Sequence, residues 1–259
     1  MAQIIYGRHP VLTALRHREA SLEEVYVAQG VSGAWVAELT RLARSRGVRI
    51  RTLPKAALDR LSGTPHHQGV AARRAEFAYL PWEELLARLP KTPGAPLVVA
   101  ADGLTDPMNL GNLARSALAA GAQGLIIPKD RAVGVTPAVL KAAAGALEIL
   151  PVCRVTNLAE TLIALKEQGL WVVGTDAGGD VNLYEVDLTV PLVLVIGGED
   201  KGLRPRVRRQ CDVLAAIPMA TDAVSSLNAA AAGAVALFEA RRQRLAKEAA
   251  SHVAEISSA

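Results

Sequence analysis

The chain has 259 residues and a formal net charge of +4, a length that allows one large or two modest domains with a buried core. No segment resembles a membrane span or a signal peptide, and aromatic residues make up only 3%, which disfavours a base-stacking sheet. Cys153 and Cys211 lie far apart and fit neither a zinc site nor a disulfide framework, so we expect a cytoplasmic protein without a metal.

Charge is unevenly distributed along the chain. Residues 1–75 hold 12 Lys and Arg against 5 Asp and Glu, a charge of +7, whereas residues 76–259 hold 17 against 20, a charge of −3. A basic module joined to a mildly acidic one is typical of a polyanion-binding domain fused to another function. Solvated arginines without a ligand would give the same composition, so charge alone leaves both interpretations open.

The first 75 residues predict a small α/β domain. Helical patterns cover residues 7–18, 33–47 and 55–63, and strand patterns cover residues 22–28, 48–53 and 68–74. A stretch with one short helix and several Pro and Gly residues follows, which we interpret as a linker. The expected division is therefore 1–75, a linker over 76–95, and a second domain over 96–259.

More apolar strands alternate with helices from Leu97 onward. The expected strands cover residues 97–101, 124–128, 150–155, 170–175, 192–198 and 213–219. Near-continuous apolar strands separated by helices indicate a parallel sheet covered on both faces. Ligands of such sheets bind beyond the carboxyl ends of the strands, so the loops after these strands are the candidate site.

The segment DPMNLGNLARSALAAGA, residues 106–122, follows the first of these strands and predicts a helix that Asp106 and Pro107 open. Its apolar stripe consists of Leu110, Leu113, Ala114, Ala117 and Leu118. Asn109, Asn112 and Arg115 fall on the opposite face, where either ordinary solvation or a functional role accounts for them.

Two later loops carry further polar groups. GGEDKGL, residues 197–203, allows close approach of backbone to a ligand but lacks the dinucleotide and P-loop patterns; its Glu199 is either a backbone cap or a functional carboxylate. SSLNAAAAGAVALFEARRQR, residues 225–244, predicts a long helix with Ser225 or Ser226 as its cap and Asn228 one turn in. The expected apolar stripe of that helix is Leu227, Ala230, Ala231, Ala234, Val235 and Phe238.

Three motifs occur in order along the chain: NLGNLARSA at 109–117, VIGGEDKGL at 195–203 and IPMATDAVSSLN at 217–228. With them the chain resembles the SpoU/TrmH family of RNA ribose 2′-O-methyltransferases of the SPOUT class, above all the branch that methylates a guanosine in bacterial 23S rRNA. GRHPV, HQGVAA and KDRAVGVTP also resemble that branch. Two positions depart from the pattern: Asp200 stands where the second motif has glycine, and the third motif is one residue longer around 221–223.

The resemblance implies an α/β fold, with a parallel-sheet SPOUT domain that contains a deep trefoil knot after a small RNA-binding domain similar to some ribosomal proteins. It also implies a homodimer that binds RNA and S-adenosylmethionine. The catalytic residues that it implies are Asn109, Arg115, Glu199, Ser226 and Asn228. The cofactor residues that it implies are Thr175, Ile196, Gly197, Gly198, Gly202, Ile217, Met219, Ser226 and Leu227.

A mechanism follows as a hypothesis from these residues. A guanidinium stays protonated in proteins, so we expect Arg115 to hold a neighbouring phosphate and to stabilise the developing alkoxide rather than to act as a base. Asn109 and Asn228 would fix the loops, and Glu199 would orient Arg115 or loop amides. The alternatives are 2′-O-methylation of another rRNA site, of the thiostrepton-resistance type, or of tRNA, and a non-catalytic RNA-binding ribosome assembly factor.

Overall fold

The computed structural model describes residues 3–17, 22–199, 202–221, 223 and 226–257. Its contacts divide the chain into two compact units: unit 1 comprises residues 1–78 and 135–149, and unit 2 comprises residues 79–134 and 150–259. Segment 135–149, which we expected in the second domain, therefore packs with the amino-terminal part of the chain.

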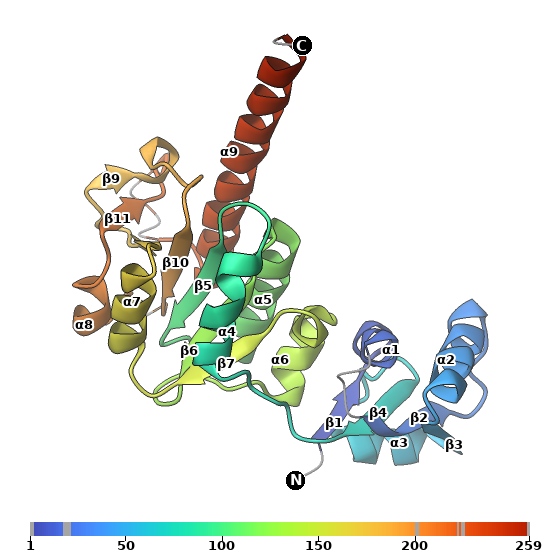
Figure 1. The fold of residues 1–259 in the computed structure, drawn as a ribbon. Helices are drawn as coiled ribbons and strands as arrows, with labels where there is room; N and C mark the ends of the chain where they lie inside the picture. The colour runs from blue at the N-terminus through green and yellow to red at the C-terminus, as the bar shows by residue number, and fades with distance from the viewer. Residues whose placement is uncertain (1–2, 18–21, 200–201, 222, 224–225, 258–259) are drawn as a thin grey trace. The chain divides into compact units, whose positions relative to one another are not determined.

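Unit 1 is built on a mixed four-stranded sheet (Figure 1). Its strand order is β1-β4-β2-β3, with β4 antiparallel to both neighbours and β2 parallel to β3. Its elements are β1 (Gln3–Tyr6), α1 (Arg8–Arg16), β2 (Leu22–Ala28), α2 (Ala34–Ser45), β3 (Arg49–Leu53), α3 (Lys55–Ser62), β4 (Val70–Arg74), α6 (Pro137–Ala142) and η2 (Ala146–Glu148). The sequence patterns located all of the strands of the amino-terminal segment except β1.

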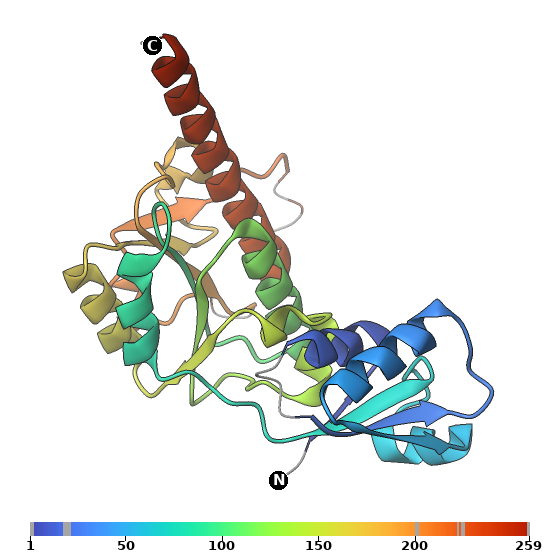
Figure 2. The same ribbon diagram turned by 45° about the vertical axis from the view of Figure 1, so that its right-hand side comes forward.

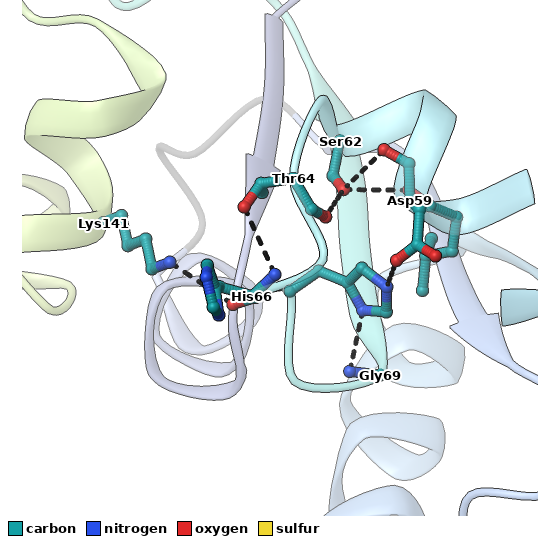
Figure 3. Close-up of polar contacts among 8 residues, drawn as sticks. Asp59, Ser62, Thr64, His66, Gly69 and Lys141 are labelled. Atoms are coloured by element: carbon teal, nitrogen blue, oxygen red, sulfur yellow. Dashed lines mark hydrogen bonds and ion pairs between the residues drawn. The ribbon is translucent and has the colours of Figure 1, made fainter. Parts of the chain in front are cut away.

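The loop between α3 and β4 is held by side chains on both sides (Figure 3). His67 is buried; its Nε2 lies 2.8 Å from Asp59 Oδ1, and its Nδ1 accepts a hydrogen bond from the backbone of Gly69. On the other side, Lys141 of α6 donates to the carbonyl of His66. Arg74 of β4 also forms a buried ion pair with Glu148, so side-chain contacts join segment 135–149 to the rest of unit 1.

Unit 2 is built on seven parallel strands in the order β7-β6-β5-β10-β8-β11-β9, which confirms the parallel sheet. Its strands are β5 (Leu97–Asp102), β6 (Gly124–Pro128), β7 (Val152–Val155), β8 (Trp171–Thr175), β9 (Val181–Asn182), β10 (Leu192–Gly197) and β11 (Val213–Ala216). Its helices are α4 (Trp82–Arg88), η1 (Leu89–Lys91), α5 (Pro107–Ala120), α7 (Leu158–Glu167), η3 (Leu183–Glu185), α8 (Pro205–Arg208) and α9 (Ala229–Ser257). The implied knot stays a prediction.

Helices cover both faces of this sheet. Apolar side chains of α4, α7 and α8 pack on one face in a single core with alternate strand residues. On the other face, α5 and α9 lie side by side in both ribbon views (Figures 1 and 2). A Cβ on Gly233 of α9 would lie 2.5 Å from Leu113 Cδ1 of α5, so a larger side chain at this position would have to displace Leu113.

Two expectations about unit 2 differ from the structure. Residues 79–95 of the expected linker lie within the unit, because α4 and η1 bury Leu85 and Leu89 in the core. The expected apolar stripe of α9 was also wrong in part: Ala230 is buried, but Ala231 is exposed and Phe238 is 50% exposed. Over residues 229–250 of the helix, the buried residues are Ala229, Ala230, Gly233, Ala236, Leu237, Glu239 and Ala240. An alanine-rich helix has little contrast between its faces, so its periodicity is a weak guide.

Candidate functional site

The carboxyl ends of the central strands β5, β10, β8 and β11 meet at one edge of the sheet of unit 2. The loops after β8, β10 and β11, together with the start of α9, line a pocket of about 460 Å³. All nine expected cofactor residues line this pocket: Thr175, Ile196, Gly197, Gly198, Gly202, Ile217, Met219, Ser226 and Leu227. Sequence positions separated by more than 50 residues are thus brought together at the expected edge.

Three polar side chains from the three motifs form a hydrogen-bonded cluster beside the pocket. Asn109 donates to the Oε1 atom of Glu199. Asn228 donates to the same atom at 2.7 Å and to Asn109 Oδ1 at 2.9 Å. Asn109 is buried, whereas Glu199 and Asn228 are exposed. The cluster therefore joins α5, the loop after β10 and the start of α9 through one carboxylate.

Asn228 also caps the amino-terminal end of α9, because it directly precedes the first helical residue. Its Oδ1 accepts hydrogen bonds from the backbone N–H groups of Ala230 and Ala231, at 3.0 and 3.2 Å, so it caps α9. We had expected Ser225 or Ser226 as the cap and Asn228 one turn inside the helix. Ser226 instead lies at the pocket, and Ser225 falls outside the described residues.

The start of α5 agrees with its sequence pattern. The Asp106 side chain accepts from the backbone N–H of Met108 at 3.1 Å, with Pro107 in the first turn. Arg115 lies two turns further on, is exposed, and makes no hydrogen bond or ion pair with any described residue. Glu199 binds the two amides rather than Arg115, which leaves the guanidinium available to an anionic ligand.

The glycine loop, defined here as residues 197–204, is held at both ends. Gly197 pairs with Asp102 in the parallel ladder, and Gly198 and Gly202 exchange backbone hydrogen bonds of 3.2 and 2.9 Å. A Cβ on Gly198 would lie 2.7 Å from the carbonyl oxygen of Gly103, so the two backbones touch. Asp200, the departure within this loop, lies outside the described residues.

Several residues at this edge were not identified from the sequence. Asp102 is fully buried and receives hydrogen bonds from Arg204, and Asp176 and Arg208 line the pocket as an ion pair of 3.8 Å. Asp176 directly follows β8, and this position after a strand is the sequence feature that could have identified it as a site residue. Among the described residues, no cluster of three His, Cys, Asp or Glu side chains could hold a metal ion, and no helix is both long and apolar enough to cross a membrane.

Comparisons with known proteins match both units. Residues 96–238 match the SpoU rRNA Methylase family model, and residues 4–80 match the model described as RNA 2′-O ribose methyltransferase substrate binding. The 23S rRNA (guanosine-2′-O-)-methyltransferase RlmB of Pseudomonas syringae is 44% identical, over 94% of this chain and 96% of that protein. The enzyme of the same name from Shewanella oneidensis is 43% identical, over 93% and 97% respectively.

A solved structure with a bound ligand is also similar. The SpoU methyltransferase AviRb from Streptomyces viridochromogenes, in complex with the cofactor AdoMet, gives a TM-score of 0.79 at 31% identity. The match covers 95% of this chain and 91% of that one.

Proposed function

Since the chain belongs to the SpoU rRNA methylase family of RNA 2′-O-ribose methyltransferases, we propose that its methyl acceptor is the ribose 2′-hydroxyl of a guanosine in 23S rRNA. Its methyl donor is S-adenosylmethionine. One observation carries the proposal: the nine expected cofactor residues line a single pocket, beside side chains from all three family motifs.

The pocket fits the methyl donor in size and chemistry. Its volume of about 460 Å³ lies within the range of small-molecule pockets, roughly 300–1,000 Å³. Ile196, Ile217 and Leu227 offer apolar surface for a planar base, and the close-packed glycine loop presents backbone groups. The donor supplies a methyl group on a positively charged sulfur, and the Glu199 carboxylate lines the same pocket. We propose the nine lining residues as the cofactor site.

Arg115 is the residue that we propose for binding the acceptor. Its exposed guanidinium has no partner among the described residues and can donate to a phosphate beside the reacting ribose. The same positive charge stabilises negative charge on the 2′-oxygen as its proton leaves to water or to a phosphate oxygen. The cluster of Asn109, Glu199 and Asn228 fixes the motifs relative to one another, and Ser226 lies at the pocket.

Unit 1 is the part that we propose for holding the RNA outside the reacting nucleotide. The substrate-binding family model covers residues 4–80, and residues 1–75 carry the charge of +7. Polyanion binding of this kind depends on phosphate contacts and falls steeply with salt. An enzyme that acts on bacterial rRNA works in the cytoplasm, which is where we place this chain.

A homodimer is the assembly that we propose, with α9 in its interface. Phe238 and Leu245, two turns apart on α9, are 50% and 46% exposed, and large apolar side chains at such a spacing suit burial against a second copy. Sedimentation equilibrium of the wild type and of Phe238→Asp tests this. A wild-type monomer at micromolar concentration contradicts the proposal.

The substrate is tested by methyl transfer to RNA. The purified protein is given S-adenosylmethionine labelled in its methyl group together with 23S rRNA, 16S rRNA or bulk tRNA lacking the modification, and modified riboses are mapped by primer extension at low dNTP. Incorporation at one guanosine of 23S rRNA supports the proposal. Modification of another nucleotide or of tRNA would contradict the proposed substrate and identify the true one. Cofactor binding without transfer to any RNA would support the assembly-factor alternative.

A further inference from the structure

The β6 loop, defined here as residues 129–134, carries exposed cations that the mechanism above does not use. Lys129 and Arg131 are exposed, and neither side chain forms an ion pair or hydrogen bond with a described residue. Asp130 lies between them and is also exposed. Arg154 of the neighbouring strand β7 adds a third exposed cation, so positive charge exceeds negative charge at this place.

Backbone contacts place the β6 loop against the functional site within unit 2. The backbone N–H of Val133 donates to the carbonyl of Leu104 at 2.8 Å. A Cβ on Gly103 would lie 3.9 Å from the carbonyl oxygen of Arg131, and a Cβ on Gly198 would lie 2.7 Å from that of Gly103. The loop after β5, which contains Gly103 and Leu104, therefore lies between Arg131 and the glycine loop that carries Glu199.

The β6 loop is held in a defined and unusual conformation. Arg131 has φ of 57°, in the left-handed region that residues with a Cβ seldom adopt, and such outliers are concentrated at functional sites. At the start of the loop, Lys129 donates its backbone N–H to Val155, and its carbonyl accepts from Arg154 Nη2 at 3.1 Å. The Arg154 guanidinium in turn lies 5.6 Å from the centre of the Tyr79 ring.

Apart from Asp130, the carboxylates in the adjoining loops have other partners among the described residues. Glu199 accepts from two amides, Asp106 caps α5, and Asp102 is buried against Arg204. A positive surface beside a site for a ribose matches the phosphodiester groups that flank that ribose in RNA. Of the two arginines, Arg154 already binds the Lys129 carbonyl and lies over the Tyr79 ring, whereas the Arg131 guanidinium has no partner among the described residues and has the fork of donors that suits a phosphate.

We propose that the β6 loop binds the RNA backbone next to the reacting nucleotide, with Arg131 as its main phosphate contact and Lys129 in support. This inference rests on the proposed function, because it requires an RNA substrate. It adds to unit 1 a second RNA contact, located in the catalytic unit itself. That contact positions the target ribose, whereas unit 1 supplies affinity for the surrounding RNA.

The test uses Arg131→Gly, because glycine adopts positive φ freely and the change removes the guanidinium without straining the backbone. Binding of a 23S rRNA fragment is measured by fluorescence anisotropy at several salt concentrations. We expect affinity to fall roughly tenfold and the slope of log Kd against log salt to drop by about 1, since one phosphate contact is lost. Binding of S-adenosylmethionine by calorimetry should not change. Arg131→Lys should restore part of the affinity.

Arg88→Ala is the matched control. Arg88 lies on α4 of the same unit, is 54% exposed, and pairs only with Glu84 among described residues, so its removal takes away the same charge at another place. Unchanged RNA affinity and salt slope in Arg131→Gly, with active wild type, would overturn the inference and leave the proposed function standing. An equal loss in Arg88→Ala would show that only overall charge matters. A wild type that neither binds nor methylates RNA would overturn the proposed function itself.

Discussion

Arg204 donates to the carboxylate of Asp102 from its backbone N–H at 2.7 Å and from Nε at 2.5 Å, while Asp102 is 0% exposed at the end of β5. Asp102 also pairs with Gly197 in the parallel ladder. A single residue therefore anchors both ends of the glycine loop that carries Glu199. The loop depends on this pair for its position, although neither residue belongs to the expected site.

Asp102→Asn should weaken S-adenosylmethionine binding about tenfold, because losing one charge-assisted hydrogen bond of the anchor costs on the order of 1.5 kcal/mol. Calorimetry measures the affinity, and thermal unfolding measures the stability. Asp212→Asn is the control: Asp212 also accepts a backbone N–H, from Val172, and pairs with Lys166, but it precedes β11 at the opposite edge of the sheet. If both variants lose stability equally and neither changes cofactor affinity, the anchor is merely structural.

Arg115→Ala should lower kcat by about 10²–10³, the typical effect of removing one preorganised donor to developing negative charge. Affinity for S-adenosylmethionine should stay within twofold, because Arg115 does not line the pocket. Single-turnover methylation of the rRNA fragment measures the chemical step. If Arg115→Lys retains near-normal turnover, bidentate contact by the guanidinium is not required.

Asn228→Ala should cost about 1 kcal/mol of stability through loss of the α9 cap, and should also lower turnover because it disconnects α9 from Glu199. Asn157→Ala removes a comparable cap from α7, where Asn157 accepts from the backbone of Glu160. Chemical denaturation and methyl transfer are measured for both. Equal losses of turnover in the two variants would contradict a role of the cluster in the reaction.

Both cysteines should be inert in the folded protein. Burial raises the pKa of Cys153 and of Cys211 to about 12, so almost no thiolate exists at pH 8. Ellman's reagent should react with neither thiol until denaturant is added, and then with both. Because the folded pKa exceeds that of the unfolded chain, stability is unaffected below about pH 9 and is lost as pH rises from about 9 toward 12. Rapid native reaction at pH 8 contradicts the low thiolate fraction that the raised pKa values imply.

Arg244→Ala should destabilise the carboxyl-terminal half of α9 by about 2–3 kcal/mol, because its guanidinium donates to the carbonyls of Ala95, Pro96, Leu188 and Val190. Arg242→Ala is the control, since Arg242 is 65% exposed and forms an ion pair with Glu239. That change should affect stability much less, because solvent screens an exposed ion pair. Hydrogen exchange of α9 amides resolves the two effects, and equal protection in both variants would refute the role of Arg244.

The sequence was most informative where local rules decide the outcome. Apolar runs located six of the seven strands of unit 2, and Asp106 with Pro107 located the start of α5. The two-residue strand β9 is too short to leave a pattern. The expected start of α9 was Ser225, whereas the helix begins at Ala229. Ser226 and Asn228 are both residue types that cap helices well, and the contacts of Asn228 with Asn109 and Glu199 decide between them.

Residues that depend on tertiary contacts were not predictable in this way. Motif positions gave the nine pocket residues, but nothing local distinguishes Asp102 from any acid after a strand. Likewise, the Pro- and Gly-rich composition after residue 75 suggested a linker, whereas Leu85 contacts the region of Gly124 within the core. Burial of a few leucines in a short helix is decided by the sheet they meet, which a local pattern does not describe.

The contribution of the start of α9 to the pocket has a consequence for folding during synthesis on the ribosome. Leu227, Ala229 and Ala232 line the pocket, and Arg244 attaches α9 to the carbonyls of Ala95 and Pro96. Chains emerge from the amino-terminal end and fold in that order. Unit 1 is incomplete until segment 135–149 has been synthesised, and the pocket is incomplete until residues 226–232 have been synthesised. If unit 1 binds RNA as proposed, we therefore expect a nascent chain to complete its RNA-binding unit before it completes the pocket.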